Sequence, residues 1–293
     1  MLPDLAALPC KLIPINFPDV KPWWTKVRPT FHYLIETEAH VYALAVAASV
    51  LLALFPFLTV MISLCRDVLK WPAAVAAVNL ALEDQFAGEI GKYIAYHLSL
   101  GQWYIPKLSV TSMFLLLFTA NGVFEPLEVA LNRAWGVTAN RSYLKNQAIS
   151  LGLILICGTL ALVSLMLSAL GGQYLTASMG FAGHVAAFVR TLLFKVAAVP
   201  ISMFALFLVY WLLPNRKVDP ARVAPVAIVV GLILEGMKYI NMVFHNAIAA
   251  KLDHEYRIFA YSVTILLWSF VGALVVLAGA HWTARHDTQD PLS

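Results

Sequence analysis

The chain has 293 residues, of which 61% are hydrophobic and only 12% are charged, and its formal net charge is +4. Soluble domains are on average about 25% charged, so the composition excludes an ordinary water-soluble protein. The small positive charge fits contact with lipid headgroups, and it does not indicate binding to nucleic acid.

Uncharged stretches recur along the chain, and a spanning helix needs roughly 20 mostly apolar residues. The sequence therefore predicts an all-α, polytopic membrane bundle of six transmembrane helices, near residues 39–64, 108–121, 148–170, 187–213, 223–244 and 258–282. We expect one membrane domain, residues 31–285, between a Pro-rich cytoplasmic N-terminal segment, residues 1–30, and a tail, residues 286–293. The prolines of the N-terminal segment predict irregular backbone, because proline removes a backbone donor.

The links between the first spans carry weaker signals. Residues 66–107 are too polar to cross a bilayer and predict one or two amphipathic surface helices. Asn121-Gly122 is expected to end a short second span, and Pro126 to start an interfacial elbow helix with one apolar face, made of Phe124, Leu127, Leu131 and Trp135. In the first span, Pro56 predicts a kink, either a plain packing kink or a hinge.

Residue patterns of metal and catalytic sites are missing from the sequence. Its three cysteines are scattered and predict free thiols. Its eight histidines form no HxH or HExxH pattern, and there is no glycine-rich phosphate loop or nucleophile elbow. We therefore expect no catalytic residue, no metal and no cofactor, and a membrane-nuclease hypothesis lacks its ligands.

Two opposite charges, Glu235 and Lys238, lie three residues apart inside the fifth expected span and so share a helical face. An ionised side chain in hydrocarbon is costly and usually faces a protein interior or a wet cavity. At a rise of about 1.5 Å per residue, Lys195 of the fourth span falls at a similar depth. The trio predicts a polar cavity for an anionic headgroup. The alternative is an internal ion pair that fixes packing, with Lys195 reaching outward.

Two Asn-Arg pairs, Asn132-Arg133 and Asn215-Arg216, stand at expected helix ends, with Arg141 after the first and Lys217 after the second. Asparagine suits helix ends, and arginine binds phosphate through two hydrogen bonds. These residues predict an entry site for an anionic lipid or substrate on the cytoplasmic face. The alternative is the ordinary excess of positive charge on that side. The same excess places both termini in the cytoplasm.

Three stretches resemble motifs of one family: Ala53-Leu54-Phe55-Pro56, residues 130–137 with 141–145, and residues 210–218. The chain is similar over residues 30–285 to the YihY/BrkB family of integral membrane proteins, and the two Asn-Arg motifs are the specific part. It resembles a divergent member, with His281 where the family usually has an acidic residue. The family was once described as a tRNA-processing ribonuclease; the resemblance implies an envelope or lipid-related role instead.

Residues and resemblance lead to one hypothesis of function: a multi-pass inner-membrane protein that transports or binds an anionic, amphiphilic envelope component, lipid or lipid-linked, through a polar intramembrane cavity. The alternative is a structural or scaffolding membrane protein whose buried charges only fix packing. The expected partners are membrane lipids and no nucleic acid. The sequence leaves substrate and oligomeric state open, a homo-oligomer included.

Overall fold

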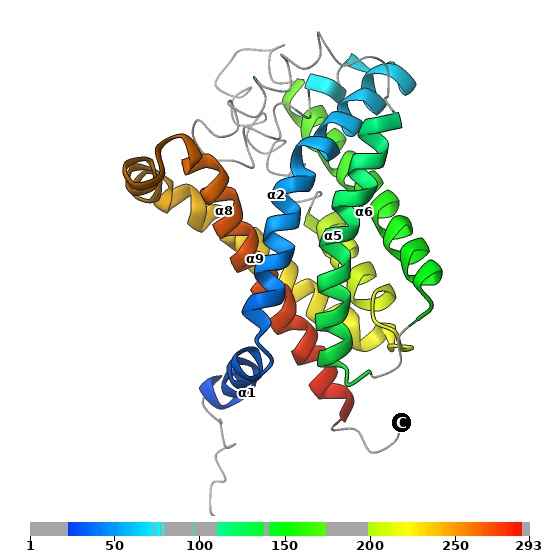
Figure 1. Cartoon of the computed structure of the whole chain (residues 1–293), viewed down its shortest axis with the longest axis vertical. Coiled ribbons are helices and arrows are strands. Elements are labelled where there is room, and N and C mark those ends of the chain that lie inside the picture. The colour runs from blue at the N-terminus through cyan, green and yellow to red at the C-terminus, as the bar shows by residue number, and fades with distance from the viewer. Residues whose placement is uncertain are drawn as a thin grey trace, which may run out of the picture.

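The computed structural model describes residues 23–72, 74–76, 78, 96, 110–137, 141–173 and 199–288, and all regular structure in them is helical. This confirms the all-α fold class. The long helices are α1 (Trp23–Glu36), α2 (Ala39–Ser63), α5 (Val110–Ala134), α6 (Tyr143–Gln173), α8 (Pro220–Tyr256) and α9 (Ala260–Thr288) (Figure 1). The π-helical turn Leu64–Val68 follows α2, and the 3-10 turn Arg257–Phe259 precedes α9. A shorter apolar helix at Val199–Leu212 is called helix 199–212 below.

Five described helices are long and apolar enough to cross a membrane: Ala39–Val68, Phe114–Ala134, Leu144–Ala161, Pro220–Asn241 and Ala260–Ala284. Helix 199–212 coincides with the second half of the fourth expected span, whose first half lies outside the described residues. The count of six spans therefore stays a prediction. The expected surface helices in residues 66–107 also lie largely outside the described residues.

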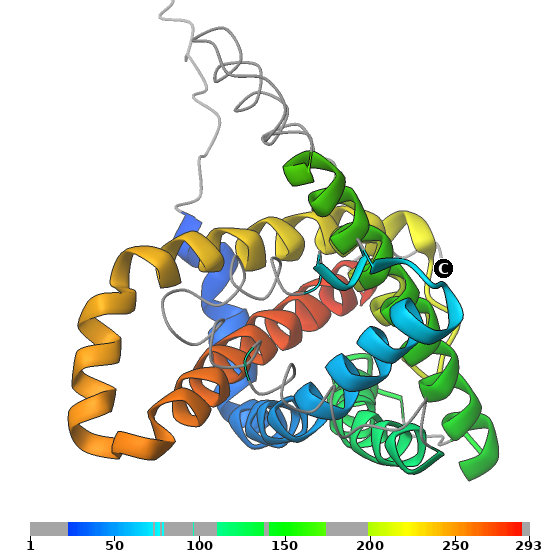
Figure 2. The same ribbon diagram turned by 90° about the horizontal axis from the view of Figure 1, so that it is seen from above.

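The helix α2 is central to the bundle, because it packs along both α5 and α9, and α8 packs on α9 (Figures 1 and 2). Small side chains allow this close approach, and Ala43 and Ala47 on α2 are fully buried. The outward faces remain apolar, with large exposed side chains such as Phe118, Leu155 and Leu232. Exposed apolar side chains in such number fit lipid tails rather than water.

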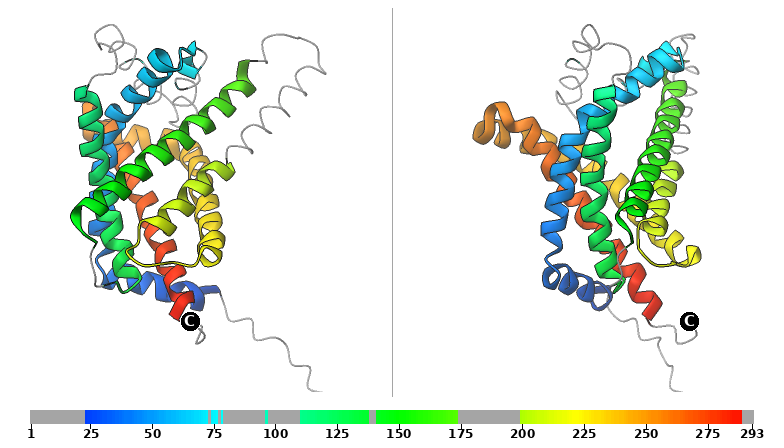
Figure 3. Two further views of the ribbon diagram at one scale, coloured as in Figure 1. Left: turned by 90° about the vertical axis from the view of Figure 1, so that its right-hand side faces the viewer. Right: turned by 45° about the vertical axis from the view of Figure 1, so that its right-hand side comes forward.

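One end of the bundle collects both Asn-Arg pairs and is called the motif end. There α5 ends and α6 begins, helix 199–212 ends and α8 begins, and α1 lies beside the last turns of α9 (Figures 1 and 3). The rings of Tyr33 on α1 and His281 on α9 stack with centroids 4.1 Å apart. Burial in this contact raises the pKa of the Tyr33 phenol. The first and last described helices are thus joined at one end.

The expected break at Asn121-Gly122 and the elbow helix are wrong, because α5 is continuous from Val110 to Ala134. Gly122 serves as a contact point instead. A Cβ added there would lie 3.0 Å from the Ser49 hydroxyl of α2, so the absent side chain lets the two helices meet. Pro126 costs one helical hydrogen bond, and packing offsets that loss. The apolar stripe at Leu127, Leu131 and Trp135 is buried as core.

The N-terminal segment is helical from Trp23 onward, where the prolines led us to expect irregular backbone. Pro29 is the single proline inside α1, and it removes one hydrogen bond from a 14-residue helix. The boundary expected at residue 30 therefore falls within a helix. At the other end of the chain, α9 runs to Thr288, past the expected start of the tail.

The helix α8 is longer than the span expected at residues 223–244, since it runs to Tyr256. It starts with Pro220 in its first turn, and the Asp219 side chain caps it by accepting a hydrogen bond from the Ala221 N–H at 3.0 Å. Its last turns bend away from the bundle and carry the start of α9 with them (Figures 1 and 2).

Candidate functional site

The Asn132 side chain joins the two Asn-Arg motifs. It lies in the last turns of α5 and is buried. Its Oδ1 accepts a hydrogen bond from the Asn215 backbone N–H at 2.7 Å, and its Nδ2 donates to Glu128 Oε1 at 3.4 Å. Two segments 83 residues apart in the chain are thereby fixed to each other, because the amide side chain supplies both a donor and an acceptor.

Arg141 holds the end of helix 199–212. It precedes α6, and its Nη1 donates to the backbone carbonyls of Leu212 at 3.2 Å and Leu213 at 3.4 Å, while its Nη2 donates to the Pro214 carbonyl. The last carbonyls of a helix have no partner within the helix, and a cation is favourable near that end. Arg141 therefore caps this helix from a different segment of the chain.

The remaining arginines of the two motifs point to different neighbours. The Arg216 guanidinium carbon lies 5.2 Å from the ring centre of buried Trp135, within reach of a cation–π interaction. Arg133 is exposed and donates through Nη1 to the Tyr42 hydroxyl of α2 at 3.4 Å. The fold thus gathers the predicted residues at one end, but Arg133 faces α2 rather than the second motif.

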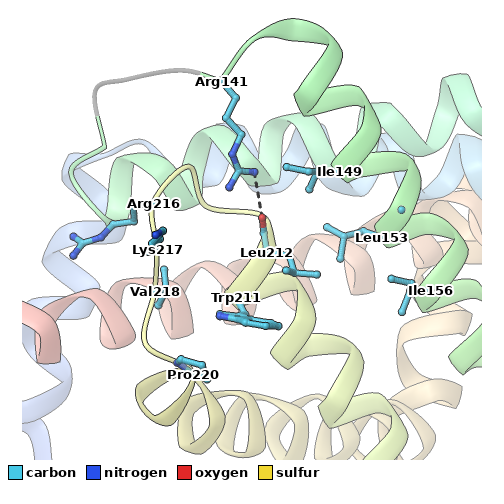
Figure 4. A pocket seen from close by; sticks show the side chains of 11 residues that line it. Arg141, Ile149, Leu153, Ile156, Trp211, Leu212, Arg216, Lys217, Val218 and Pro220 are labelled. Atoms are coloured by element: carbon cyan, nitrogen blue, oxygen red, sulfur yellow. Dashed lines mark hydrogen bonds between the residues drawn. The ribbon is translucent and has the colours of Figure 1, made fainter.

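A pocket of about 520 Å³ opens beside these contacts, between α6, helix 199–212 and the loop that leads into α8 (Figure 4). One wall is a stripe on α6 at the i, i+3, i+4 and i+7 positions. Trp211 and Leu212 of helix 199–212 face this stripe (Figure 4). Three basic residues stand at one end, and none of the described residues that line the pocket is acidic. Its lining is Arg141, Ile149, Gly152, Leu153, Ile156, Trp211, Leu212, Arg216, Lys217, Val218 and Pro220.

The cations are arranged unequally around the pocket. In Figure 4 the Arg141 guanidinium points into the space between the loop and α6, whereas the Arg216 side chain is turned away from it. Lys217 is exposed and forms no hydrogen bond or ion pair with any residue that the structure describes. Of the two arginines, Arg141 is thus the one that points towards the apolar wall.

Gly152, Trp211 and the α6 stripe were not identified from the sequence as site residues. A Cβ added to Gly152 would meet no atom within 4 Å, so the missing side chain keeps the pocket open. Apolar spacing does occur in residues 149–156, but the same spacing is typical of a lipid-facing side. The sequence therefore held no signal that separates a pocket wall from a membrane surface.

Glu235 and Lys238 pair with each other on α8, with 3.0 Å between Lys238 Nζ and Glu235 Oε1. Their side chains are 26% and 33% exposed, and neither lines the pocket described above. Glu235 lies about 22 Å along α8 from Pro220, at 1.5 Å per residue. Lys195 lies outside the described residues, so the expected cavity around the trio stays a prediction. The same holds for a hinge at Pro56, through which α2 remains helical.

Among the described residues, no group of three or more His, Cys, Asp or Glu side chains is placed to hold a metal ion. The site that the structure does define is the pocket at the motif end. The pocket is complementary to a ligand with an apolar part and an anionic part, because it combines aliphatic and aromatic walls with basic residues at one end.

Long apolar helices with apolar outward faces define a multi-pass helical membrane protein. The chain belongs to the family described as Virulence factor BrkB, whose model matches residues 30–291. This confirms the resemblance to the YihY/BrkB family.

Similar proteins bear names that describe membrane location and no activity. A UPF0761 membrane protein of Legionella pneumophila is 23% identical over 272 residues, covering 88% of this chain and 63% of that protein. One of Chlorobium chlorochromatii is 24% identical over 255 residues, covering 85% and 56%. One of Pseudoalteromonas translucida is 22% identical over 273 residues, covering 89% and 85%. The chain thus spans about three fifths of the first two relatives. No solved structure matches it.

Proposed function

We propose that this membrane protein binds an anionic amphiphile in the pocket at the motif end and passes it across or along the bilayer. The observation that carries the proposal is the pocket itself, an apolar space of about 520 Å³ whose described lining residues include three cations and no carboxylate. Ligand pockets in proteins have volumes of about 300–1,000 Å³. We place the motif end at the cytoplasmic face of the inner membrane, where basic residues are favoured.

Each part of the pocket corresponds to one part of such a ligand. Ile149, Leu153 and Trp211 offer the walls for an acyl chain, whose transfer out of water is favourable in proportion to its buried area. Arg141 and Lys217 offer charge-assisted donors for an anionic head. In this proposal the head lies at the membrane surface and the chain at the depth of the lipid tails.

Filling the pocket without changing its charge tests this proposal. We expect Gly152→Leu to abolish most binding of an anionic amphiphile, since the new side chain occupies the space of the ligand. The measurement is native mass spectrometry of detergent-purified full-length chain titrated with 1-oleoyl-lysophosphatidate. Gly236→Leu is the matched control, because a Cβ at Gly236 also meets no atom within 4 Å and lies outside the pocket lining. Equal binding by wild type and Gly152→Leu would exclude this pocket.

We also propose that the ligand passes a second, polar site (the station), formed around Glu235 and Lys238, after it leaves the pocket. The test reconstitutes Lys238→Met and Glu235→Gln into liposomes and follows movement of a fluorescent anionic lipid between leaflets. Slower movement by both variants would support the station, and unchanged movement in both would remove the pair from the path.

A structural role is the second candidate function, and one observation favours it for this pair. Lys238 and Glu235 neutralise each other at 3.0 Å on one helix, so neither charge needs a ligand. In that case the single variants lower thermal stability, and the double variant Glu235→Gln/Lys238→Met regains most of it, because both charges are removed together.

A further inference from the structure

We propose that the ligand of this pocket carries a phosphate monoester head, bound side-on by the free edge of Arg141, and that heads with an added cation are rejected. This inference rests on the proposed function and specifies the headgroup class. Its basis is the number and position of the hydrogen-bond donors that Arg141 retains after it has capped helix 199–212.

A guanidinium has five N–H donors in one plane, fixed by its geometry. In Arg141 the Nη1 group faces the carbonyls of Leu212 and Leu213, and one Nη2 hydrogen faces the carbonyl of Pro214. Nε–H has no partner among the described residues, and Nη2 has two hydrogens and one described partner. Nε and Nη2 together form one edge of the guanidinium. The three carbonyls thus hold the group in place and leave one bidentate edge for a ligand.

The chain itself shows what this edge binds. In Arg66, Nε donates to Asp67 Oδ1 at 2.8 Å and Nη2 donates to Asp67 Oδ2 at 3.1 Å. The same pair of nitrogens is therefore used side-on against two oxygens of an anion elsewhere in this fold. Phosphate and carboxylate both present two oxygens at the spacing that such an edge requires.

A third oxygen distinguishes phosphate from carboxylate at this site. Lys217 also lines the pocket and has no ion-pair partner among the described residues. A phosphate monoester offers three terminal oxygens, so two fit the Arg141 edge and the third is left for the Lys217 ammonium. A carboxylate has no third oxygen. The charge of a phosphate monoester, close to −2 at neutral pH, also matches two cations better than −1 does.

We expect zwitterionic heads to be rejected because no described residue of the lining carries a carboxylate. The nearest carboxylate in sequence, Asp219, already caps α8 through the Ala221 N–H and lies 3.7 Å from Arg222. A choline or ethanolamine group would therefore lie beside Arg141 and Lys217, with no carboxylate among the described lining residues to receive it. Unfavourable charge pairs of this kind discriminate between ligands even where the apolar contacts are equal.

Four probes that differ in the head alone, or lack the chain, test this inference by native mass spectrometry of the full-length chain in detergent. They are 1-oleoyl-lysophosphatidate, 1-oleoyl-lysophosphatidylcholine, oleate and inorganic phosphate. We expect the phosphate monoester to bind at least about tenfold more tightly than its choline ester. The choline ester keeps the two oxygens for the Arg141 edge, but it lacks the third oxygen for Lys217 and adds one repulsion. We expect oleate to fall between them and inorganic phosphate to bind weakly.

Two variants test whether Arg141 and Lys217 are the residues that bind the headgroup. Arg141→Lys keeps the charge but removes the bidentate edge that both anions use. We therefore expect the affinity for oleate to fall as well as that for lysophosphatidate, the latter by about ten- to a hundredfold. Lys217→Met leaves the Arg141 contacts intact, so it reports on the head even if Arg141→Lys loosens the helix end. Lys145→Met is the matched control, an exposed basic residue at the same end that does not line the pocket.

The outcomes separate this inference from the proposed function. Tight lysophosphatidate binding that is lowered by Lys217→Met and unchanged in Lys145→Met supports the inference. Equal binding of lysophosphatidate and lysophosphatidylcholine, still blocked by Gly152→Leu, overturns the headgroup assignment and leaves the pocket as an amphiphile site. If inorganic phosphate binds as tightly as lysophosphatidate, the conclusion that the phosphate group belongs to a lipid is overturned. Binding that Gly152→Leu leaves unchanged overturns the proposed function as well.

Discussion

At the scale of single residues, Asn132 decides how the two Asn-Arg motifs meet. Its amide contacts the Asn215 backbone on one side and the Glu128 carboxyl group on the other. Glu128 is buried, and its Oε2 has no hydrogen-bond partner among the described residues. A buried polar group without a partner costs free energy, so the single amide of Asn132 matters to both neighbours.

Replacing this amide by an apolar group of similar size should lower stability. We expect Asn132→Leu to reduce the free energy of unfolding by roughly 1–3 kcal/mol, because it leaves the Asn215 N–H and the Glu128 carboxyl group without their partner. Thermal unfolding of the detergent-purified protein measures this effect. Asn246→Leu on α8 replaces an exposed amide and should leave the midpoint nearly unchanged. A similar shift in both variants would show that the amide contacts contribute little.

At the scale of helices, glycines mark contacts between packed elements. Gly279 on α9 lies where a Cβ would come within 2.6 Å of the Tyr210 hydroxyl oxygen and within 2.5 Å of a Val230 methyl group. Tyr210 is fully buried, and its hydroxyl donates to the Val276 carbonyl at 2.7 Å. Helix 199–212 and α8 both reach α9 here because Gly279 has no side chain.

A single methyl group at this crossing should disturb the bundle. We expect Gly279→Ala to destabilise the protein by about 1–3 kcal/mol, since neither Tyr210 nor Val230 has space to yield without repacking. Gly152→Ala adds the same methyl group on α6 with no atom within 4 Å, and it should be neutral or slightly stabilising. Thermal unfolding of the two variants, compared side by side, tests the crossing; equal midpoints would contradict it.

The contact between α2 and α5 can be tested by cross-linking. An ideal Cβ at Gly122 lies 3.4 Å from the Ser49 Cβ, close to the separation of about 3.5–4.5 Å found in disulfides. We expect the double variant Ser49→Cys/Gly122→Cys to form a disulfide under mild oxidation, detected by mass spectrometry of peptides. Ser49→Cys/Asn121→Cys serves as the control, because the neighbouring position points about 100° away on the helix. Cross-linking of the control alone would contradict continuous packing through Gly122.

At the scale of the whole molecule, the two ends of the bundle differ in character. The motif end carries the pocket, the last turns of α9 and α1, whereas the last turns of α8 lie at the far side with Lys251 exposed (Figure 1). Basic residues favour the cytoplasmic side of a membrane, so we expect the motif end to face the cytoplasm.

Labelling with a membrane-impermeant maleimide tests this orientation in a cysteine-free background. We expect Lys217→Cys to react after the membrane is permeabilised and Lys251→Cys to react in intact cells, because the two residues lie towards opposite ends of α8. The reverse labelling pattern would show that the protein has the opposite orientation, with the pocket at the outer face of the membrane.

Much of the site could be anticipated from residue types, but its geometry could not. Spacing and charge pointed to Asn132, Arg141, Arg216 and Lys217 as one group of interest. That Asn132 bonds to Asn215, or that Arg141 caps a helix 71 residues away, depends on contacts between distant segments. A motif specifies which groups are available, whereas the fold specifies which of their hydrogen bonds remain for a ligand.

The sequence by itself determined that this chain is helical and crosses a membrane, because the cost of placing charges and unpaired backbone groups in hydrocarbon acts on every residue locally. Tertiary structure decided the rest. Local propensity predicted a break at Gly122, but the absence of a side chain there serves the contact with Ser49. The sequence does not distinguish the apolar residues of α6 that line the pocket from those that face lipid. The distinction arises because helix 199–212 packs opposite one side of α6 and leaves a pocket at Gly152. Such outcomes depend on which helices meet, and packing between helices is a property of the assembled bundle.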